Sequence, residues 1–342
     1  MTRRSDAVTI YKVAQKAGVS VATVSRYLNR STPVSDEIAK KLDQIMTELN
    51  YVPHAAARHL ASRKTSVIGL LLTNIDNEFF APLVSGIEQV VRKRGYNLLV
   101  ATYHADNRGS VPPPVGRHNT DGLLVFADTL KDEELVKLHD GEFPIVLIHR
   151  TPPISLNVPS VTVENKSASQ RLIEHLILQH NKKRILFLRG PIHQEDSYWR
   201  ETGYRSALEA HGIPFDEQLV LVGEFQRDVA YKALNEFLDR RDHPAFDAIF
   251  SGDDDAAIGV LRAVQEHGYR VPEDIAVVGF DDLQISAFMT PPLTTVRAPT
   301  QIVGRIAAER LFDFMNKEVA ESLALLPTEI IIRHSCGCTT QA

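Results

Sequence analysis

Short apolar runs alternate with segments of helical periodicity from residue 66 to the end of the chain. Typical runs are VIGLLLT at 67–73, GLLVF at 122–126 and IAVVGF at 275–280. Continuous runs of this kind suit strands buried on both faces of a parallel sheet, and the helical segments between them supply the crossovers that parallel strands need. The pattern therefore predicts an α/β protein built from doubly wound parallel sheets.

The number of predicted strands indicates more than one sheet. The chain of 342 residues is long for one domain, and one compact sheet usually holds fewer strands than the runs predict. We therefore expect two similar lobes, an N-lobe of about 66–163 plus 293–315 and a C-lobe of about 164–290 plus 318–338. The predicted strands are 67–73, 98–102, 122–126, 145–149, 161–163, 185–189, 219–222, 248–250, 275–280 and 329–333, and the predicted helices are 80–94, 166–179, 203–211, 227–240 and 255–267.

One stretch interrupts the alternation. A crossover helix is needed between the strands predicted at 98–102 and 122–126, but residues 108–120 contain three successive prolines at 112–114 and two glycines. Proline lacks the N–H group that a helix interior requires. This stretch is therefore predicted to be an irregular, exposed loop.

The first sixty residues have a different pattern, with two short helices predicted around Gly18. Apolar residues recur at helical spacing over 10–17. Gly18 then ends the helix, because it adopts a positive φ at little cost. Ser20 follows as an N-cap for a second helix, 21–29, which has one apolar and one polar face. Two helices joined in this way predict a helix-turn-helix, whose second helix can enter a DNA major groove.

Charge and the following residues support this interpretation. Residues 1–64 carry 11 Lys and Arg against 5 Asp and Glu, whereas the remainder carries 27 against 38. A basic head on an acidic body indicates that the head meets a polyanion. Ser35 is a predicted N-cap for a third helix that ends near Asn50 and closes a small three-helix core. A helical hairpin of an ordinary domain is the alternative, and position and charge together favour DNA binding.

The segment after the third helix is short and alanine-rich. Residues 53–65 follow the helix-turn-helix domain of 1–52 and precede the core of 66–342. About two turns of helix are marginal alone in water. The segment is either a flexible linker or a hinge that becomes helical on DNA, with Leu60 as a wedge in the minor groove.

The sequence contains none of the motifs typical of common nucleotide-binding or hydrolytic enzymes. GxGxxG, Walker A, GxSxG and HExxH patterns are all missing from it. A small-molecule-binding α/β protein or enzyme without a DNA-binding role and a sugar-binding receptor are the alternatives, and the basic head argues against them. No apolar run has the length of a membrane span and no signal peptide is recognisable. We therefore expect a cytoplasmic protein that is not an enzyme.

Cysteine usage predicts neither a disulfide nor a metal site. Cys336 and Cys338 are the two cysteines, and a disulfide between them would close almost no loop. Two ligands are too few for a structural zinc site, and histidines such as His175 and His180 are not spaced as ligand pairs. Reduced thiols are expected, with no metal and no cofactor.

Over nearly its whole length the sequence resembles the LacI/GalR family of bacterial transcriptional regulators. The most specific residues are VAQKAGVSVATVSRYLN at 13–29 and LNYVPHAAARHL at 49–60. The body agrees at DGLLVF (121–126), GDDDAAIG (252–259), VPEDIAVVGFDD (271–282) and PPLTTV (291–296). The resemblance implies a helix-turn-helix head and a two-lobed core like periplasmic sugar-binding proteins. It also implies a homodimeric repressor of a near-palindromic operator, controlled by a small effector such as a sugar. No heptad run follows the last predicted strand, so a tetramerisation tail is not expected.

The resemblance also implies roles for residues of the head. Arg at a base-reading position can bond bidentately to guanine, whereas Val and Ala offer only apolar contact. Contacts to the DNA backbone set the register without reading the sequence. The implied base-reading positions are Val21, Ala22 and Arg26; the implied backbone contacts are Tyr11, Ser20, Thr23, Ser25, Asn29, Ser35, Tyr51 and His54; and Leu60 matches the residue that opens the central base step.

In the core, the resemblance implies an effector site between the lobes, at the carboxyl ends of the strands. Arg200 and Asp281 match the main pair of ligand-holding positions, where they could bond sugar hydroxyls or an effector carboxylate. For Phe79 and Phe225, core packing is the alternative. The other implied effector contacts are Thr73, His149, Arg150 and Asp253.

Overall fold

The computed structural model describes residues 8–29, 32–51, 64–103, 112–318 and 322–339 of the chain. The chain divides into two compact units, Met1–Thr65 and Ser66–Ala342, which are described separately. None of the helices in these ranges is both long enough and apolar enough to cross a membrane.

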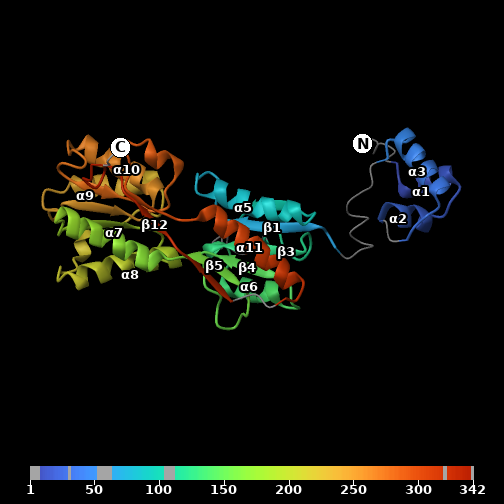
Figure 1. The fold of residues 1–342 in the computed structure, drawn as a ribbon, viewed down its shortest axis with the longest axis horizontal. Helices are drawn as coiled ribbons and strands as arrows, with labels where there is room; N and C mark the ends of the chain where they lie inside the picture. Colours follow the sequence, from blue (N-terminus) through green and yellow to red (C-terminus); the bar gives the residue numbers. More distant parts are fainter. Residues whose placement is uncertain (1–7, 30–31, 52–63, 104–111, 319–321, 340–342) are drawn as a thin grey trace, which may run out of the picture. The chain divides into compact units, whose positions relative to one another are not determined.

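The first unit is a three-helix bundle of α1 (Ile10–Ala17), α2 (Val21–Asn29) and α3 (Asp36–Glu48) (Figure 1). Gly18 ends α1 with a φ of 68°, as predicted. The hydroxyl of Ser20 accepts a hydrogen bond from the Thr23 N–H at 3.1 Å, and Ser35 caps α3. These bonds confirm both predicted N-caps. The buried core consists of Val13, Ala14, Ala17, Val24, Leu42 and Ile45.

The second unit contains the two predicted parallel sheets, which confirms the α/β fold. Each predicted strand is present, with small differences at the ends. The first sheet has the order β11-β5-β4-β3-β1-β2 and the second has the order β7-β6-β8-β9. The strands of the first sheet are β1 (Val67–Leu72), β2 (Asn97–Thr102), β3 (Gly122–Phe126), β4 (Ile145–Ile148), β5 (Ser160–Val163) and β11 (Leu323–Leu326); those of the second are β6 (Ile185–Arg189), β7 (Val220–Val222), β8 (Ala248–Ser251) and β9 (Ala276–Val278).

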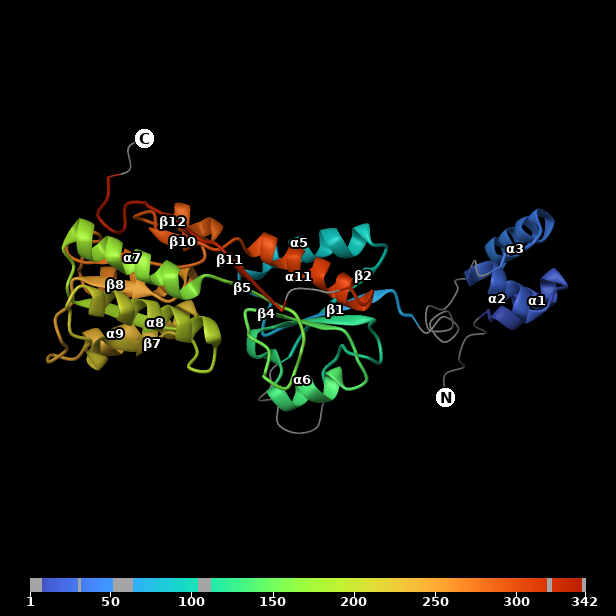
Figure 2. The same cartoon turned by 60° about the horizontal axis from the view of Figure 1, so that its bottom comes forward.

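Both faces of each sheet are covered, which explains why the strands are apolar without alternation. In the first sheet, α5 (Phe80–Lys93) and α11 (Thr300–Met315) lie on one side and α6 (Asp132–His139) lies on the other (Figure 2). Leu70 belongs to the core cluster that contains residues of α5 and α11, and Leu71 belongs to a separate cluster with residues of α6. The second sheet lies between α7 (Asn165–His180) and α8 (Glu195–Ala210) on one face and α9 (Arg227–Leu238) and α10 (Asp254–Glu266) on the other (Figure 1).

The division of the chain between the lobes differs from the predicted one near the C-terminus. Residues 323–326, assigned to the C-lobe, form the unpredicted strand β11, which pairs with β5 of the first sheet. Residues 295–297, assigned to the N-lobe, form the unpredicted strand β10 (Thr295–Arg297), which pairs with β12 (Glu329–Ile331). Thr294, just before β10, is bridged to Val278 of the second sheet, and Arg297 is bridged to Asp281. The chain therefore crosses between the lobes after β5, after β10 and after β11. Strands β10 and β11 have only three and four residues, and β11 is partly exposed, so neither was recognised as a buried strand.

Three helical segments were not predicted. Helices α6 and α11 are additional, and the helix predicted at 203–211 begins earlier, at Glu195. The first half of α8 has the sequence EDSYWRET, which lacks a continuous apolar stripe. Its side chains border a polar cavity, so helical periodicity does not reveal it.

The proline-rich stretch is irregular, as predicted, but its second half is not exposed. Residues 112–120 contain no helix, and residues 108–111 lie outside the described ranges. Val115 is only 1% exposed and packs in the cluster that covers β1 and β3 from the α6 side. Asn119 and Thr120 donate side-chain hydrogen bonds to the carbonyls of Pro114 and Gly116, both at 2.9 Å. This hydrogen-bonded loop therefore covers β1 and β3 in place of a crossover helix.

Candidate effector cavity and DNA-binding head

A cavity of about 370 Å³ lies between the two lobes of the second unit. It opens where the strands of both parallel sheets end, which is the usual ligand position in open α/β folds. Its size suits a small organic ligand. The N-lobe contributes Thr73, Asn74, Asn77, Phe79, Phe80, Phe126 and Asp128, and the C-lobe contributes Pro191, His193, Gln194, Asp196, Arg200, Glu224, Phe225, Gln226, Asp253 and Asp281.

Arg200 is the central cation of this wall. It extends from α8, is only 2% exposed, and donates to three acceptors. Its guanidinium lies flat against the Phe280 ring, 3.7 Å from the centroid, and 5.1 Å from the centroid of Phe225. Because every nitrogen of the fork has a partner, the side chain is held in one position. The acceptors are the Asn165 Oδ1 at 2.9 Å, the Gly252 carbonyl at 2.6 Å and the Asp281 Oδ1 at 3.1 Å.

Asp196 forms a second buried network beside Arg200. Its carboxylate accepts from Asn165 Nδ2 at 2.7 Å and lies 2.8 Å from His149 Nδ1. Burial by itself favours the protonated acid, but His149, Arg200 and Asn165 outweigh it and lower the pKa of Asp196. Asp196 is therefore an ionised acceptor at the cavity.

The pKa values of three other cavity acids are shifted in the opposite direction. Burial raises the pKa of Asp281, with Arg200 opposing the shift. Burial and the nearby carboxylate of Asp281 raise the pKa of Asp253 well above its usual value. Burial also raises the pKa of Asp128 to about 6. The cavity acids therefore differ in how readily they lose a proton, and a carboxyl group accepts from a ligand hydroxyl when ionised and can also donate to it when protonated.

Six of the eight predicted effector contacts line the cavity. The structure brings together Thr73, Phe79, Arg200, Phe225, Asp253 and Asp281.

His149 and Arg150 do not line the cavity, which corrects their predicted place as wall residues. His149 is 2% exposed and packs behind Phe79 and Phe126, with ring centroids 5.7 and 5.4 Å away. Arg150 turns away to the Leu130 carbonyl and the Asp132 carboxylate. His149 therefore positions Asp196, while Arg150 ties the end of β4 to α6.

Several cavity residues were not predicted. Asn74 and Asn77 follow β1, Asp128 follows β3, and Gln194 and Asp196 border or begin α8. The Oδ1 atom of Asn74 is buried and has no hydrogen-bond partner among the described residues. A polar residue directly after a predicted strand was the available signal, because carboxyl ends of parallel strands meet at one edge.

The head presents one face of α2 to solvent. Ala22 and Arg26 are exposed four residues apart, and Val21 and Ser25 beside them are partly exposed. Val24 on the opposite face is fully buried. This places the predicted base-reading residues on one helical face.

The predicted backbone contacts that the structure describes differ in exposure and in local role. Ser20 and Ser35 lie at the first turns of α2 and α3, where their hydroxyls cap the helices. Tyr11 is 71% exposed on α1, whereas Thr23 and Tyr51 are partly buried. The side chain of Asn29, the residues His54 and Leu60, and the hinge stretch 52–63 lie outside the described part of the chain.

A helix-turn-helix unit followed by a two-lobed α/β core with a ligand-sized cavity defines a ligand-responsive DNA-binding regulator. Residues 9–54 match the bacterial regulatory proteins of the lacI family, and residues 173–336 match the periplasmic binding protein-like domain. The chain belongs to the LacI family and is a DNA-binding transcriptional regulator, not an enzyme.

Named relatives match over almost the full chain. Catabolite control protein A of Priestia megaterium is 32% identical over 332 residues, covering 96% of this chain and 99% of that protein. The HTH-type transcriptional regulator CelR of Thermobifida fusca is 34% identical over 345 residues, covering 96% and 98%. The lac repressor dimer bound to operator and the anti-inducer ONPF matches with a TM-score of 0.79 at 25% identity, covering 96% of this chain and 99% of that chain.

Proposed function

We propose that this protein is a cytoplasmic, homodimeric repressor whose operator affinity is set by a neutral sugar bound between the lobes of the core. The donor and acceptor arrangement around Arg200 carries this proposal. The relatives support the ligand class, since one solved structure is a CelR–cellobiose complex at 30% identity and one relative is the ribose operon repressor of Escherichia coli.

The charge of the cavity favours a neutral ligand over a phosphorylated or carboxylated one. Arg200 is the one guanidinium or ammonium group among the described lining residues, and its nitrogens already have partners. The charge of a phosphorylated or carboxylated ligand would be repelled by the ionised cavity acids, and no unpaired cation among the described lining residues would offset that repulsion. Sugar hydroxyls can instead donate to carboxylate oxygens, and they can accept from any carboxyl group that keeps its proton. The lining carboxyl groups are Asp128, Asp196, Glu224, Asp253 and Asp281.

Two features of the wall suit a sugar ring. Phe79 from the N-lobe and Phe225 from the C-lobe supply aromatic surface, against which the apolar faces of a pyranose can pack. Asn74 offers a buried amide oxygen that lacks a partner, ready to accept from a hydroxyl. A ligand that bonds both sets of residues stabilises one arrangement of the lobes over others.

The regulatory mechanism follows from this shared contact. A ligand shifts a conformational equilibrium only by its difference in affinity for the two states. Because the sugar would contact both lobes, it would favour one lobe orientation and so change how a dimer presents its two heads to the operator. DNA and sugar affinities are then linked reciprocally.

The head would read a near-palindromic operator with one α2 in each major groove. Arg26 is the proposed hydrogen-bonding reader, bidentate to a guanine, and Val21 and Ala22 would contact thymine methyl groups. The capped starts of α2 and α3, at Ser20 and Ser35, place backbone N–H groups and hydroxyls for phosphate contacts.

The sugar site can be tested with the intrinsic fluorescence of the chain. Its one tryptophan, Trp199, precedes Arg200 on α8. The full-length protein is titrated with neutral sugars, including cellobiose and ribose, and with glucose 6-phosphate and glucuronate. A saturable response to a neutral sugar, and none to the two anions, is expected.

The variant Arg200→Ala should lose this response and the effect of the sugar on operator binding, while operator binding itself persists. A normal response in Arg200→Ala would remove Arg200 from the site. Tighter binding of the anionic sugars than of every neutral one would contradict the proposed ligand class.

A further inference from the structure

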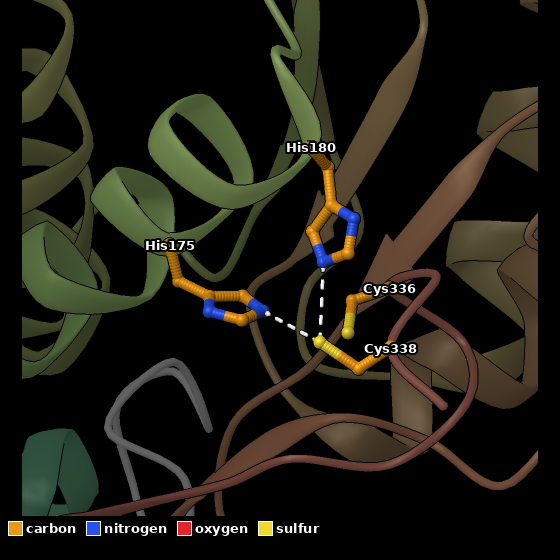
Figure 3. A group of neighbouring side chains, drawn as sticks. All are labelled: His175, His180, Cys336 and Cys338. Carbon is orange, nitrogen blue, oxygen red and sulfur yellow. Dashed lines mark hydrogen bonds between the residues drawn. The ribbon is translucent and has the colours of Figure 1, made fainter. Parts of the chain in front are cut away.

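Four metal-ligating side chains meet where the end of the chain packs against α7 (Figure 3). His175 and His180 lie near the C-terminal end of α7, and Cys336 and Cys338 follow β12. In the sequence the two pairs are more than 150 residues apart, so cysteine and histidine spacing predicted no metal site. The fold joins the two pairs into one group of four, an arrangement that the spacing does not reveal.

The distances within the group are close to those of a coordination shell. Cys338 Sγ lies 3.3 Å from His180 Nε2 and 3.6 Å from His175 Nε2, and all four ligand atoms lie within 4.8 Å of one another. Tetrahedral zinc has bonds of about 2.0–2.3 Å to nitrogen and sulfur, which places ligand atoms about 3.3–3.8 Å apart. Small side-chain movements would bring all four atoms to that separation.

Figure 3 shows both rings turned toward the sulfur of Cys338, with Cys336 beside it. Each histidine therefore directs its Nε2 atom to the same point, and the two rings cross at 71° instead of stacking. If the two imidazole rings served only for packing, nothing would require both Nε2 atoms to point toward the same sulfur.

The backbone around the cysteines holds them in place. Ser335 donates its hydroxyl to the Val277 carbonyl at 2.6 Å, and Thr294 donates its hydroxyl to Cys336 Sγ at 3.1 Å. Gly337 between the cysteines has a φ of 106°, a conformation that other residues rarely adopt. A Cβ atom there would lie 3.1 Å from His180 Nδ1. Glycine thus lets the loop turn both thiols toward the histidines.

The four side chains are of the types that zinc binds in structural sites. Imidazole nitrogens and thiolate sulfurs make up such ligand sets. A divalent ion deprotonates the thiols that coordinate it, so the cysteines need not be ionised before it binds.

We propose that His175, His180, Cys336 and Cys338 bind one Zn²⁺ ion that fastens the end of the chain to α7. Thiolate and imidazole donors in a tetrahedral N₂S₂ set select zinc over the hard cations calcium and magnesium. Binding forms two Zn–S and two Zn–N bonds and releases the two thiol protons to solvent. The four ligands leave no open position, so the ion is structural and takes no part in the effector cavity.

Cobalt substitution of the full-length protein tests this proposal. The protein is purified under reducing conditions, its zinc is measured by mass spectrometry, and the chelated protein is titrated with Co²⁺. We expect one metal ion per chain, intense tetrahedral d–d absorption and a thiolate-to-cobalt charge-transfer band. Because the chain has two cysteines, a thiolate band can arise only at this site.

Substitutions at the ligands distinguish a loss of metal coordination from a loss of folding. Cys338→Ser and His175→Gln should each weaken metal binding by more than the roughly 10- to 100-fold that loss of an outer-shell partner costs. His211→Gln, an exposed histidine at the end of α8, should bind like the wild type. Far-ultraviolet circular dichroism and operator binding establish that each variant is folded.

Three results would overturn the proposal. The first is the lack of a thiolate-to-cobalt band in the reduced wild-type protein. The second is metal binding that Cys338→Ser and His175→Gln leave unchanged. The third is a disulfide between the two cysteines that persists in protein purified under reducing conditions.

Discussion

Arg26 extends from the exposed face of α2, where the neighbouring proposed base-reading positions carry only apolar side chains. Hydrogen-bond discrimination at this face therefore depends on one guanidinium. Val21 and Ala22 add shape and methyl contact, which discriminate less strongly.

Arg26→Ala should reduce the preference for operator over unrelated DNA by about 1–3 kcal/mol, the usual value of a bidentate base contact. Fluorescence anisotropy with both duplexes at one salt concentration measures it. Lys40→Ala, an exposed lysine of α3, is the matched control and should weaken binding to both duplexes by a similar, smaller factor. If Arg26→Ala also weakens both duplexes equally, Arg26 contacts phosphate instead of a base.

The cavity residues that could be predicted from the sequence are those that match recognisable positions of the family. Asp253 and Asp281 stand in the motifs GDDDAAIG and VPEDIAVVGFDD, and Arg200 matches a ligand-holding position of the family. Asn74 and Asp196 were missed, because a polar residue after a strand or at a helix start does not reveal whether it faces a cavity. His149 follows a strand as Thr73 does, yet it turns behind Phe79, a direction that depends on backbone geometry and neighbours from distant elements.

At the scale of elements, the N-terminus of α10 carries a buried acid that the cavity does not use. Asp254 accepts from the hydroxyls of Ser286 and Thr295, both at 2.6 Å, and from the Leu283 N–H at 3.0 Å. Burial raises the pKa of Asp254 to about 7, even though these donors oppose the shift. The folded chain therefore holds this proton at pH values where the unfolded chain has lost it.

The sign of the resulting pH dependence follows from linkage. Between about pH 4 and pH 7 the folded state binds more protons at Asp254 than the unfolded state, so the free energy of unfolding falls as pH rises. Asp254→Asn should remove this contribution, which has a maximum slope of about 1.4 kcal/mol per pH unit. Urea unfolding of wild type and variant from pH 5 to pH 8 measures the difference. Parallel curves would show that Asp254 does not titrate with folding.

The irregular stretch 112–120 shows where element prediction from sequence succeeds and fails. Successive prolines exclude a helix locally, so the lack of one was predictable. The burial of Val115 was not, because it depends on β1, β3 and α6, which meet only in the folded lobe. The first half of α8 was missed for a related reason: its residues that face the cavity are polar, so the sequence shows no apolar helical stripe there.

Val115→Ala should lower the free energy of unfolding by about 1–3 kcal/mol, because it removes buried methyl groups and leaves a cavity. Val136→Ala, an exposed valine on α6, is the control and should change it by less than about 0.5 kcal/mol. Urea denaturation of the three proteins gives the comparison. Equal effects of the two substitutions would mean that the loop does not seal the lobe.

At the scale of the whole molecule, the chain combines a basic head with an acidic, two-lobed core. The alternation of apolar runs was sufficient to predict two parallel sheets, since the central strands, such as β3, β4 and β8, are buried by helices on both faces. The exchange of β10 and β11 between the lobes was not predictable from the same pattern, because both strands are short and β11 is partly exposed. These crossings connect the lobes that a bound sugar would bridge.

In the proposed mechanism, one ligand between the lobes changes how the heads bind DNA. Operator affinity is measured with and without the sugar that gives the saturable fluorescence response, and sugar affinity is measured with and without operator. We predict that the sugar changes operator affinity by about 5- to 150-fold and that the operator changes sugar affinity by the same factor. A sugar that saturates the cavity and leaves operator affinity unchanged would contradict the account.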